Sequence, residues 1–298
     1  MNTLLEKLIA NSPVITDGAW GTQLQCFGLR TGESPDAWNL THPDSVEQVA
    51  ASYITAGSQV ILTNTFGANR IALGRRGLVG SVREINREGV RISKQAAGKD
   101  RFVFGSMGPC GSISRASDLD DDMIQSAFDE HAALLAENGV DGLVLETMFR
   151  LDEALLALRA ARKTGLPVVA SMTYSGEGAQ IGTLISGETL EQATAALVES
   201  GADVIGANCG NGVGQVSAIC RRLRAVCSLP IWMKPNAGLP DFPISARGAA
   251  VYPTGVLAFA FGAVELAASG ASFVGGCCGT SPEYIREIRR FVDHDHGA

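Results

Sequence analysis

Short apolar runs, rich in valine and isoleucine, alternate along the chain with longer stretches in which apolar residues recur every three or four positions. The short runs predict strands, and the longer stretches predict amphipathic helices. Each short run ends in glycine, asparagine, threonine or cysteine, which is typical of a strand that turns into a helix. The eight predicted strands are Val14–Thr16, Gln59–Thr63, Phe102–Gly105, Gly142–Leu145, Val168–Met172, Val204–Ala207, Ile231–Lys234 and Ser272–Gly275.

Eight strands that alternate with eight helices predict parallel pairing and the α/β class. The architecture we expect is a single (β/α)8 TIM barrel that forms one domain over residues 1–298, because no linker or repeat divides the chain. An open, doubly wound sheet is the rival arrangement. It is disfavoured because no G-x-G-x-x-G phosphate loop follows the first strand.

Sequence signals mark the ends of several helices. The segments Ser45–Gln48 and Thr189–Gln192 match the capping-box pattern, in which serine or threonine precedes glutamine by three positions. Pro282, after a serine, predicts the start of the last helix, because proline is favoured in the first helical turn. Gly57 predicts a glycine cap at the end of an earlier helix.

Composition narrows the possible partners and location. Charged residues make up 18% of the 298 positions and the net charge is −7, which argues against nucleic acid and anionic membranes as partners. No apolar run approaches the roughly 18 residues of a transmembrane helix, and the first residues lack the pattern of a secretory signal. Seven cysteines, an odd number, do not suggest a disulfide framework. We therefore expect a cytoplasmic protein, and its oligomeric state stays open.

Three cysteines stand where a barrel would place them in one cavity. Cys209 follows the sixth predicted strand, and Cys277 and Cys278 follow the eighth, while the C-terminal ends of all barrel strands meet on one face. Three thiolates in one cavity suit a soft tetrahedral ion, and zinc with one open position is the leading candidate. Two alternatives stay open: small buried side chains, or a strained redox disulfide between the adjacent pair.

Other strand-end residues are candidates for binding substrate. Asp17 and Glu146 follow the first and fourth strands and together favour a cationic substrate group, although each could instead cap a helix. Asn208 and Asn236 could hold a carboxylate or a water beside the metal, but asparagine is also a common turn residue. Trp20 is the best-placed aromatic residue to bind a cation, with ordinary packing as the alternative. The other aromatic candidates are Phe66, Phe149 and Tyr174.

Six short motifs resemble those of the homocysteine S-methyltransferases, the family that includes the homocysteine-binding module of cobalamin-dependent methionine synthase. The motifs are DGAWGT from Asp17, TNTFGA from Thr63, ET from Glu146, NCG from Asn208, PNAGL from Pro235 and GGCCGT from Gly275. They occur in the family's order over nearly the whole chain, and the last is the most specific. The family fold is a (β/α)8 barrel, which agrees with the strand pattern.

The resemblance implies roles for the residues that match these motifs. It implies that the three strand-end cysteines hold Zn²⁺, and that Glu146 with the segment Asp17–Gly18 holds the amino-acid end of homocysteine. It also implies that Asn236 approaches the zinc when substrate is absent. Some relatives use a tyrosine beside the fourth-strand acid for this role, where this chain has Thr147.

The implied reaction moves a methyl group from a donor to the thiolate of homocysteine and forms methionine, a step of methionine biosynthesis. A thiol that coordinates zinc loses its proton. A zinc ion with three thiolates has a formal charge of about −1, so the bound sulfur should stay nucleophilic. The barrel supplies proximity and orientation, and no protein nucleophile is required.

The sequence leaves the methyl donor and the wider role open. Betaine, S-methylmethionine or another onium donor would need a cation-binding pocket. A methyl-corrinoid would have to arrive on a separate protein, because the sequence given ends after the predicted barrel. The protein could therefore be a component of a corrinoid-dependent system, or act on another thiol. From a different class, it could be a non-catalytic module that binds zinc or a thiol.

Overall fold

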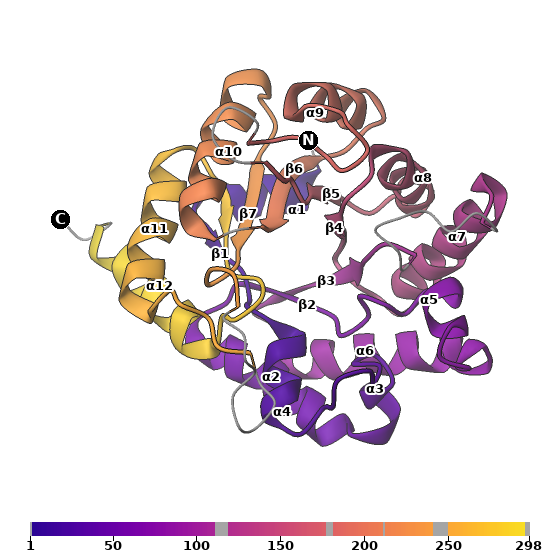
Figure 1. Ribbon diagram of the computed structural model, residues 1–298. Helices are drawn as coiled ribbons and strands as arrows, with labels where there is room; N and C mark the ends of the chain where they lie inside the picture. The colour runs from indigo at the N-terminus through magenta and orange to yellow at the C-terminus, as the bar shows by residue number, and fades with distance from the viewer. Residues whose placement is uncertain (1, 111–118, 177–180, 211, 241–249, 296–298) are drawn as a thin grey trace.

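The computed structural model of the protein describes residues 2–110, 119–176, 181–210, 212–240 and 250–295. Its strands are β1 (Val14–Ile15), β2 (Val60–Leu62), β3 (Phe102–Met107), β4 (Gly142–Met148), β5 (Val168–Met172), β6 (Val204–Cys209), β7 (Ile231–Pro235) and β8 (Phe273–Val274). All are parallel and lie in the order β1-β8-β7-β6-β5-β4-β3-β2. A parallel bridge between Thr16 and Val60 joins β1 to β2 and closes the sheet (Figure 1). The predicted (β/α)8 barrel is confirmed.

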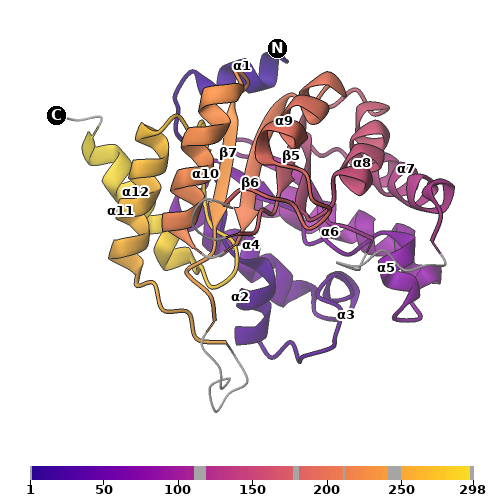
Figure 2. The same ribbon diagram turned by 45° about the horizontal axis from the view of Figure 1, so that its top comes forward.

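Helices surround the strands. They are α1 (Thr3–Ile9), α2 (Trp20–Cys26), α3 (Trp38–Thr41), α4 (Pro43–Ala56), α5 (Arg70–Gly74), α6 (Val82–Ala97), α7 (Asp121–Glu137), α8 (Leu151–Arg162), α9 (Leu190–Glu199), α10 (Val213–Val226), α11 (Val256–Ala268) and α12 (Pro282–Asp295). The eight predicted helices correspond to α4 and α6 to α12. The short α1 lies at the opposite end of the barrel from α2 and α3 (Figure 2). In the part of the chain that is described, no helix has the length and apolar character needed to cross a membrane.

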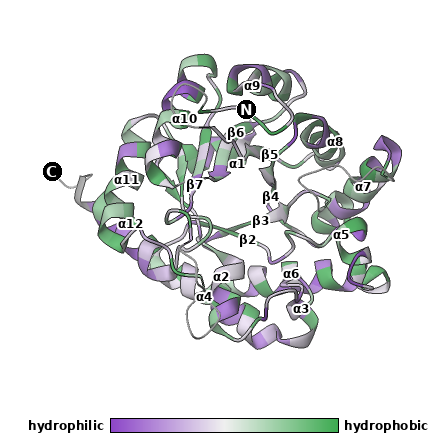
Figure 3. Ribbon diagram, viewed as in Figure 1, coloured by the Kyte–Doolittle hydropathy of each residue, from purple (hydrophilic) through white to green (hydrophobic). Residues whose placement is uncertain are grey.

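The outer helices have one face against the barrel and one face toward solvent. In α6 the buried residues recur every three or four positions, as in Ile85, Gly89 and Ile92. Apolar and polar residues accordingly alternate along these helices in Figure 3. Packing of the apolar faces on the sheet therefore holds the barrel together.

The helix signals were mostly correct. Thr189 caps α9 in a capping box in which both reciprocal hydrogen bonds with Gln192 are present. Gly57 caps α4 with a φ of 106°, and α12 begins at Pro282. The predicted capping box at Ser45 is wrong. Helix α4 already begins at Pro43, because proline fits the first helical turn, so Ser45 lies inside the helix.

Near the N-terminal ends of the strands, the barrel interior is an apolar layer. Trp232 of β7 lies between Phe104 of β3 and Phe273 of β8, with ring centroids 6.3 Å and 5.2 Å apart. Leu5 and Leu8 of α1 pack against the same cluster. The other members of this apolar layer are Val14, Val60, Leu62, Val144, Val169 and Val204. This end of the barrel is therefore filled by side chains and closed by α1.

A polar layer lies above it on the same strands. Because side chains alternate between the two faces of a strand, residues two positions further along also point inward. At these positions the apolar residues give way to polar ones: Thr16, Ser106, Glu146, Ser171 and Lys234. The polar layer faces the C-terminal ends of the strands, where the loops of a TIM barrel form its binding site.

Candidate functional site

A cavity of about 470 Å³ opens at the C-terminal ends of the strands, above the polar layer. Its wall comes from β2, β4, β6 and β7 and from loops that follow β1, β2, β3 and β8. The sequence-predicted residues in this wall are Gly18, Trp20, Phe66, Glu146, Cys209, Cys277 and Cys278. The structure thus brings together residues that are far apart in the sequence. Asp17, Asn208 and Asn236 are buried and contact residues of the site.

Three thiols meet in the wall of this cavity. Cys209 ends β6, Cys277 and Cys278 follow β8, and their Sγ atoms all lie within 4.8 Å of one another. All seven cysteines of the chain are free, so no disulfide joins the adjacent pair in this structure. Three sulfur atoms at this separation can bind one metal ion.

Two glycines allow the cysteine loop to pack closely, one against the residue after β1 and the other against the loop itself. A Cβ atom on Gly275 would lie 1.9 Å from the hydroxyl oxygen of Thr16, and one on Gly276 would lie 2.3 Å from that of Thr280. These distances are far below van der Waals contact, so a side chain at either position would displace the loop. The glycines of the GGCCGT motif therefore position the two cysteines that follow them.

Backbone strain is concentrated at the site. Among the described residues other than glycine, only Thr147 and Cys209 have a positive φ, of 60° and 65°. This left-handed conformation is uncommon for residues with a side chain, and it persists where neighbouring contacts enforce it. Both residues line the cavity.

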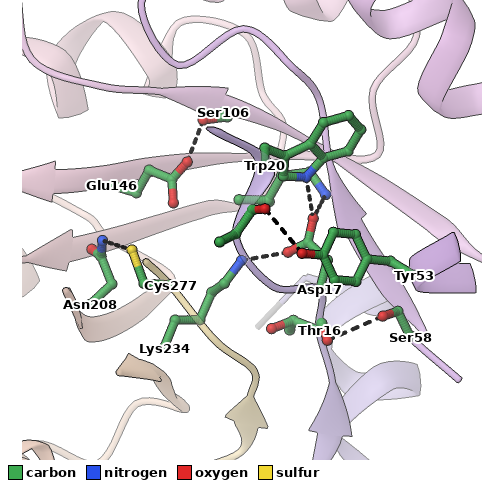
Figure 4. Close-up of polar contacts among 12 residues, drawn as sticks. Thr16, Asp17, Trp20, Tyr53, Ser58, Ser106, Glu146, Asn208, Lys234 and Cys277 are labelled. Carbon is green, nitrogen blue, oxygen red and sulfur yellow. Dashed lines mark hydrogen bonds and ion pairs between the residues drawn. The ribbon is translucent and has the colours of Figure 1, made fainter. Parts of the chain in front are cut away.

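Asn208 is one source of these enforcing contacts. Its amide oxygen accepts hydrogen bonds from the backbone N–H of Thr147 (2.9 Å) and the hydroxyl of Ser171 (2.7 Å). Its Nδ2 donates to the Thr147 hydroxyl (2.7 Å) and points toward the Sγ of Cys277 at 3.8 Å (Figure 4). The amide of Asn208 thus connects the end of β4 to the thiols.

Asn236 contacts another of the three thiols. Its Nδ2 donates to the backbone oxygen of Gly210 (2.7 Å) and to the Sγ of Cys209 (3.4 Å). Its Oδ1 is buried and has no hydrogen-bond partner among the described residues. A buried amide oxygen without a partner is energetically costly, so a ligand or ion beside the thiols would stabilise it.

The three thiols form one electrostatic unit. Hydrogen bonds from the thiols of Cys277 and Cys278 lower the pKa of Cys209 to about 3. The shared bonds with Cys209 raise the pKa of Cys277 well above its ordinary value. One negative charge is therefore favoured on Cys209, while further ionisation is opposed by the like charge already present.

Glu146 presents a carboxyl group to the cavity from the end of β4. Burial raises its pKa, and the nearby ammonium of Lys234 and the hydroxyl of Ser106 lower it again in part. The Ser106 hydroxyl donates to one carboxylate oxygen, which fixes the side chain (Figure 4). No other protein donor to this carboxylate is found among the described residues.

Asp17 is held entirely by protein groups. One carboxylate oxygen accepts hydrogen bonds from the indole N–H of Trp20 and the backbone N–H of Leu62, both at 2.7 Å. The other oxygen pairs with the ammonium of Lys234, and the Asp17 side chain is fully buried. The sequence interpretation did not single out Lys234. Its signal was a lysine in an otherwise apolar strand, which needs a buried counterion.

Tyr53 is a second residue that the sequence interpretation missed. From α4, its hydroxyl reaches the backbone oxygens of Ala19 and Thr280, at 3.0 Å each. These oxygens belong to the loops that follow β1 and β8. Tyr53 therefore ties the loop that carries Trp20 to the loop that carries the adjacent cysteines. Nothing in its local sequence distinguishes it from an ordinary core residue.

Two of the four aromatic candidates reach the cavity. Trp20 and Phe66 are part of its wall, and Phe66 is 41% exposed. Phe149 and Tyr174 do not line it, and Tyr174 is buried. An aromatic surface for a cationic group is thus available on the side of the loops that follow β1 and β2.

Known proteins resemble this chain in sequence and in fold. A family model described as homocysteine S-methyltransferase matches residues 14–292. The methionine synthases of Mycobacterium tuberculosis and Mycobacterium leprae are 33% and 32% identical to this chain over 98% of its length. The chain spans about a quarter of the length of these relatives, because the match covers 25% of each.

The fold is shared with a solved structure. The metallated form of the homocysteine methyltransferase MmuM from Escherichia coli superposes with a TM-score of 0.79. The match covers 96% of this chain and 99% of that one, at 21% sequence identity. At this identity the likeness shows a common barrel.

Proposed function

Because this chain belongs to the homocysteine S-methyltransferase family, we propose that it transfers a methyl group to the sulfur of homocysteine at a zinc ion held by three cysteines. The observation that carries the proposal is the cluster of Cys209, Cys277 and Cys278, whose sulfurs lie within 4.8 Å of one another in the cavity. The product would be methionine.

The residues present fit a zinc ion. Three sulfur ligands leave one position of a tetrahedral site for the thiol of the substrate. The unpartnered Oδ1 of Asn236 lies on a side chain that already contacts Cys209, so this amide could approach the ion when no substrate is bound. When bound, zinc lowers the pKa of a coordinated thiol and so supplies a nucleophilic thiolate at neutral pH.

The chain's own residues would bind and orient the substrate. Glu146 has a carboxylate oxygen that can pair with the ammonium group of homocysteine. Amide groups of Asn208 and Asn236 point at the cysteine sulfurs, and such contacts fix the orientation of metal ligands. As the new bond between sulfur and the methyl carbon forms, the bond from that carbon to the donor breaks. The cavity's main contribution is to align these two groups.

The methyl donor is proposed from the shape and chemistry of the entrance. A more open hollow of about 760 Å³ adjoins the cavity and shares Ser34, Ala72 and Arg76 with it. Through this hollow the methyl donor could reach the cavity while homocysteine is bound there. Trp20 and Phe66 would stabilise the positive charge of an onium donor such as S-methylmethionine or betaine.

A second candidate is a component of a corrinoid-dependent system. The observation that favours it is the match to methionine synthases that are about four times as long as the matched part. In this case the same site would methylate homocysteine, and a separate methyl-carrying protein would deliver the methyl group through the open hollow.

The test is methionine formation, followed by mass spectrometry, with reduced, zinc-loaded protein and homocysteine. Single donors are compared: S-methylmethionine, betaine, dimethylsulfoniopropionate and methylcobalamin. Turnover with an onium donor would establish a self-sufficient enzyme, and turnover with methylcobalamin alone would favour the corrinoid system. A protein that binds neither zinc nor homocysteine would contradict the proposal. A protein that binds zinc and homocysteine but has no activity with any donor or carrier would be a non-catalytic binding module.

A further inference from the structure

A buried lysine belongs to the wall of the catalytic cavity. Lys234 is 2% exposed, lies on β7 directly above Trp232, and lines the cavity together with Glu146 and Cys277. Charged side chains are rarely buried unless they are paired or used. A charge at this position would act at short range and with little solvent screening on anything that enters the cavity.

The partner of this lysine is fixed. Asp17 accepts two hydrogen bonds of 2.7 Å on one oxygen, from Trp20 and the backbone of Leu62, and pairs with Lys234 through the other. All of these donors belong to the protein, so the Asp17 carboxylate is already occupied. The Asp17 side chain therefore anchors Lys234, while the substrate contact that the motif implies for the Asp17–Gly18 segment stays a prediction.

The ammonium of Lys234 has N–H donors that no described protein group uses. It carries three N–H donors, and within the described part of the chain its hydrogen bonds go to Asp17 alone. Figure 4 shows the side chain between Asp17 on one side and Glu146 and Cys277 on the other. The remaining donors are thus available to an acceptor group in the cavity.

We infer that Lys234 forms a carboxylate-binding subsite that selects thiols carrying an α-carboxylate. This inference rests on the proposed function and extends it. An amino-acid thiol has one cationic and one anionic group. The cavity offers a matching pair, with the Glu146 carboxylate for the ammonium and the Lys234 ammonium for the carboxylate. Two-point binding of this kind would fix the direction in which the thiol points.

A purely structural role for Lys234 makes a different prediction. If the lysine only neutralised Asp17, its removal would weaken the binding of every thiol to a similar extent. If it binds the carboxylate, its removal would weaken only those thiols that carry one. The two roles are separated by the ratio of the affinities of one variant for a thiol with a carboxylate and a thiol without one. A general disturbance of the site would change both affinities equally and would leave this ratio unchanged.

The experiment measures dissociation constants by titration calorimetry on reduced, zinc-loaded protein. The two ligands are homocysteine and 3-aminopropane-1-thiol, which has the same thiol and ammonium groups but no carboxylate. We expect the wild-type protein to prefer homocysteine by about 10- to 100-fold, as for a charge-assisted hydrogen bond. In Lys234→Met the preference should fall to within about threefold. Lys94→Met removes a lysine paired with Asp141 outside the cavity and should keep the full preference.

A second variant guards against loss of folding. Lys234→Met leaves the Asp17 charge buried without its partner, which is destabilising. The double variant Asp17→Asn with Lys234→Met removes both charges and should also lose the preference. A preference that persists in either variant, or is absent in the wild type, would overturn the inference while leaving the proposed function intact. If the wild type binds neither thiol, the proposed function fails and the inference fails with it.

Discussion

The apolar and polar layers inside the barrel are built by the same strands, two residues apart, and they have opposite properties. In the apolar layer Phe104, Trp232 and Phe273 pack ring against ring under the cover of α1. In the polar layer the next inward positions of β3 and β7 are Ser106 and Lys234, beside an open cavity. One set of side chains completes a core, and the other surrounds a space that a ligand can fill.

Strand β7 contributes one residue to each layer. Trp232 and Lys234 are neighbours on one face, and the ammonium lies 5.8 Å from the indole ring centroid. The tryptophan is buried by protein on all sides, which stabilises the fold. The lysine is buried only with a paired carboxylate, and such pairs contribute little to stability after desolvation. The apolar layer thus carries stability, and the polar layer is the part that we propose carries chemistry.

The largest expected effect comes from the site. Cys278→Ser should abolish zinc binding and lower methyl transfer about 10⁴-fold, equivalent to roughly 5 kcal/mol, because a thiolate ligand is lost. The fold should be retained, since the residue lies outside the apolar layer. Metal analysis and methionine formation measure the loss. Cys26→Ser, at an exposed cysteine, is the matched control. Full activity in Cys278→Ser would refute the zinc mechanism.

A substitution in the apolar layer should instead affect stability and leave activity largely intact. Phe104→Ala should lower the free energy of unfolding by about 3 to 5 kcal/mol, because it leaves a cavity in a closed, fully packed region. The molecules that remain folded should methylate homocysteine within a fewfold of the wild-type rate. Urea unfolding and initial rates measure the two quantities. A loss below about 1 kcal/mol would mean that this layer does not carry the stability.

A smaller effect, on binding, is expected at Glu146 in the polar layer. Glu146→Gln keeps the shape of the side chain but removes the charge that would pair with the substrate ammonium. The KM for homocysteine should rise about 10- to 100-fold, with a smaller change in kcat. Glu153→Gln is the matched control, because burial raises the pKa of Glu153 as well and it does not line the cavity. An equal rise in both variants would argue against ammonium binding by Glu146.

The smallest effect concerns His131, a buried residue outside the site that should make the stability of the fold sensitive to acid. Burial lowers the pKa of His131, on α7, to about 3. The imidazole therefore stays neutral in the folded state, while the unfolded chain takes up a proton below about pH 6.5. Folding stability from this residue should decrease as the pH falls, by about 1.4 kcal/mol between pH 7.5 and 5.5. His131→Gln should lose that much less than the wild type in urea unfolding at the two pH values. Equal losses in both proteins would show that His131 does not contribute.

Local patterns predicted most of the fold. All eight strands were found because each is a short apolar run with a clear end, and Thr189 caps its helix as expected. Ser45 failed because a proline two positions earlier already begins the helix. The thiols were found because adjacent cysteines among glycines are distinctive. Their ligation of zinc stays a prediction.

The supporting contacts were beyond the reach of local patterns. Lys234 and Asp17 are 217 residues apart, and Tyr53 and Thr280 are 227 apart. Contacts over such separations depend on how the closed barrel brings the early and late parts of the chain together. A single buried lysine or tyrosine has no partner within its own stretch of sequence. Only the assembled structure shows which carboxylate or loop it holds.

The binding of zinc by three cysteines and the substrate thiol is tested most simply by X-ray absorption at the zinc edge, which counts the sulfur atoms around the metal without requiring a methyl donor. The reduced, zinc-loaded protein is measured with and without homocysteine. We expect three sulfur neighbours, from Cys209, Cys277 and Cys278, and a fourth when homocysteine is added. A sulfur count that does not change on addition of homocysteine would contradict this expectation.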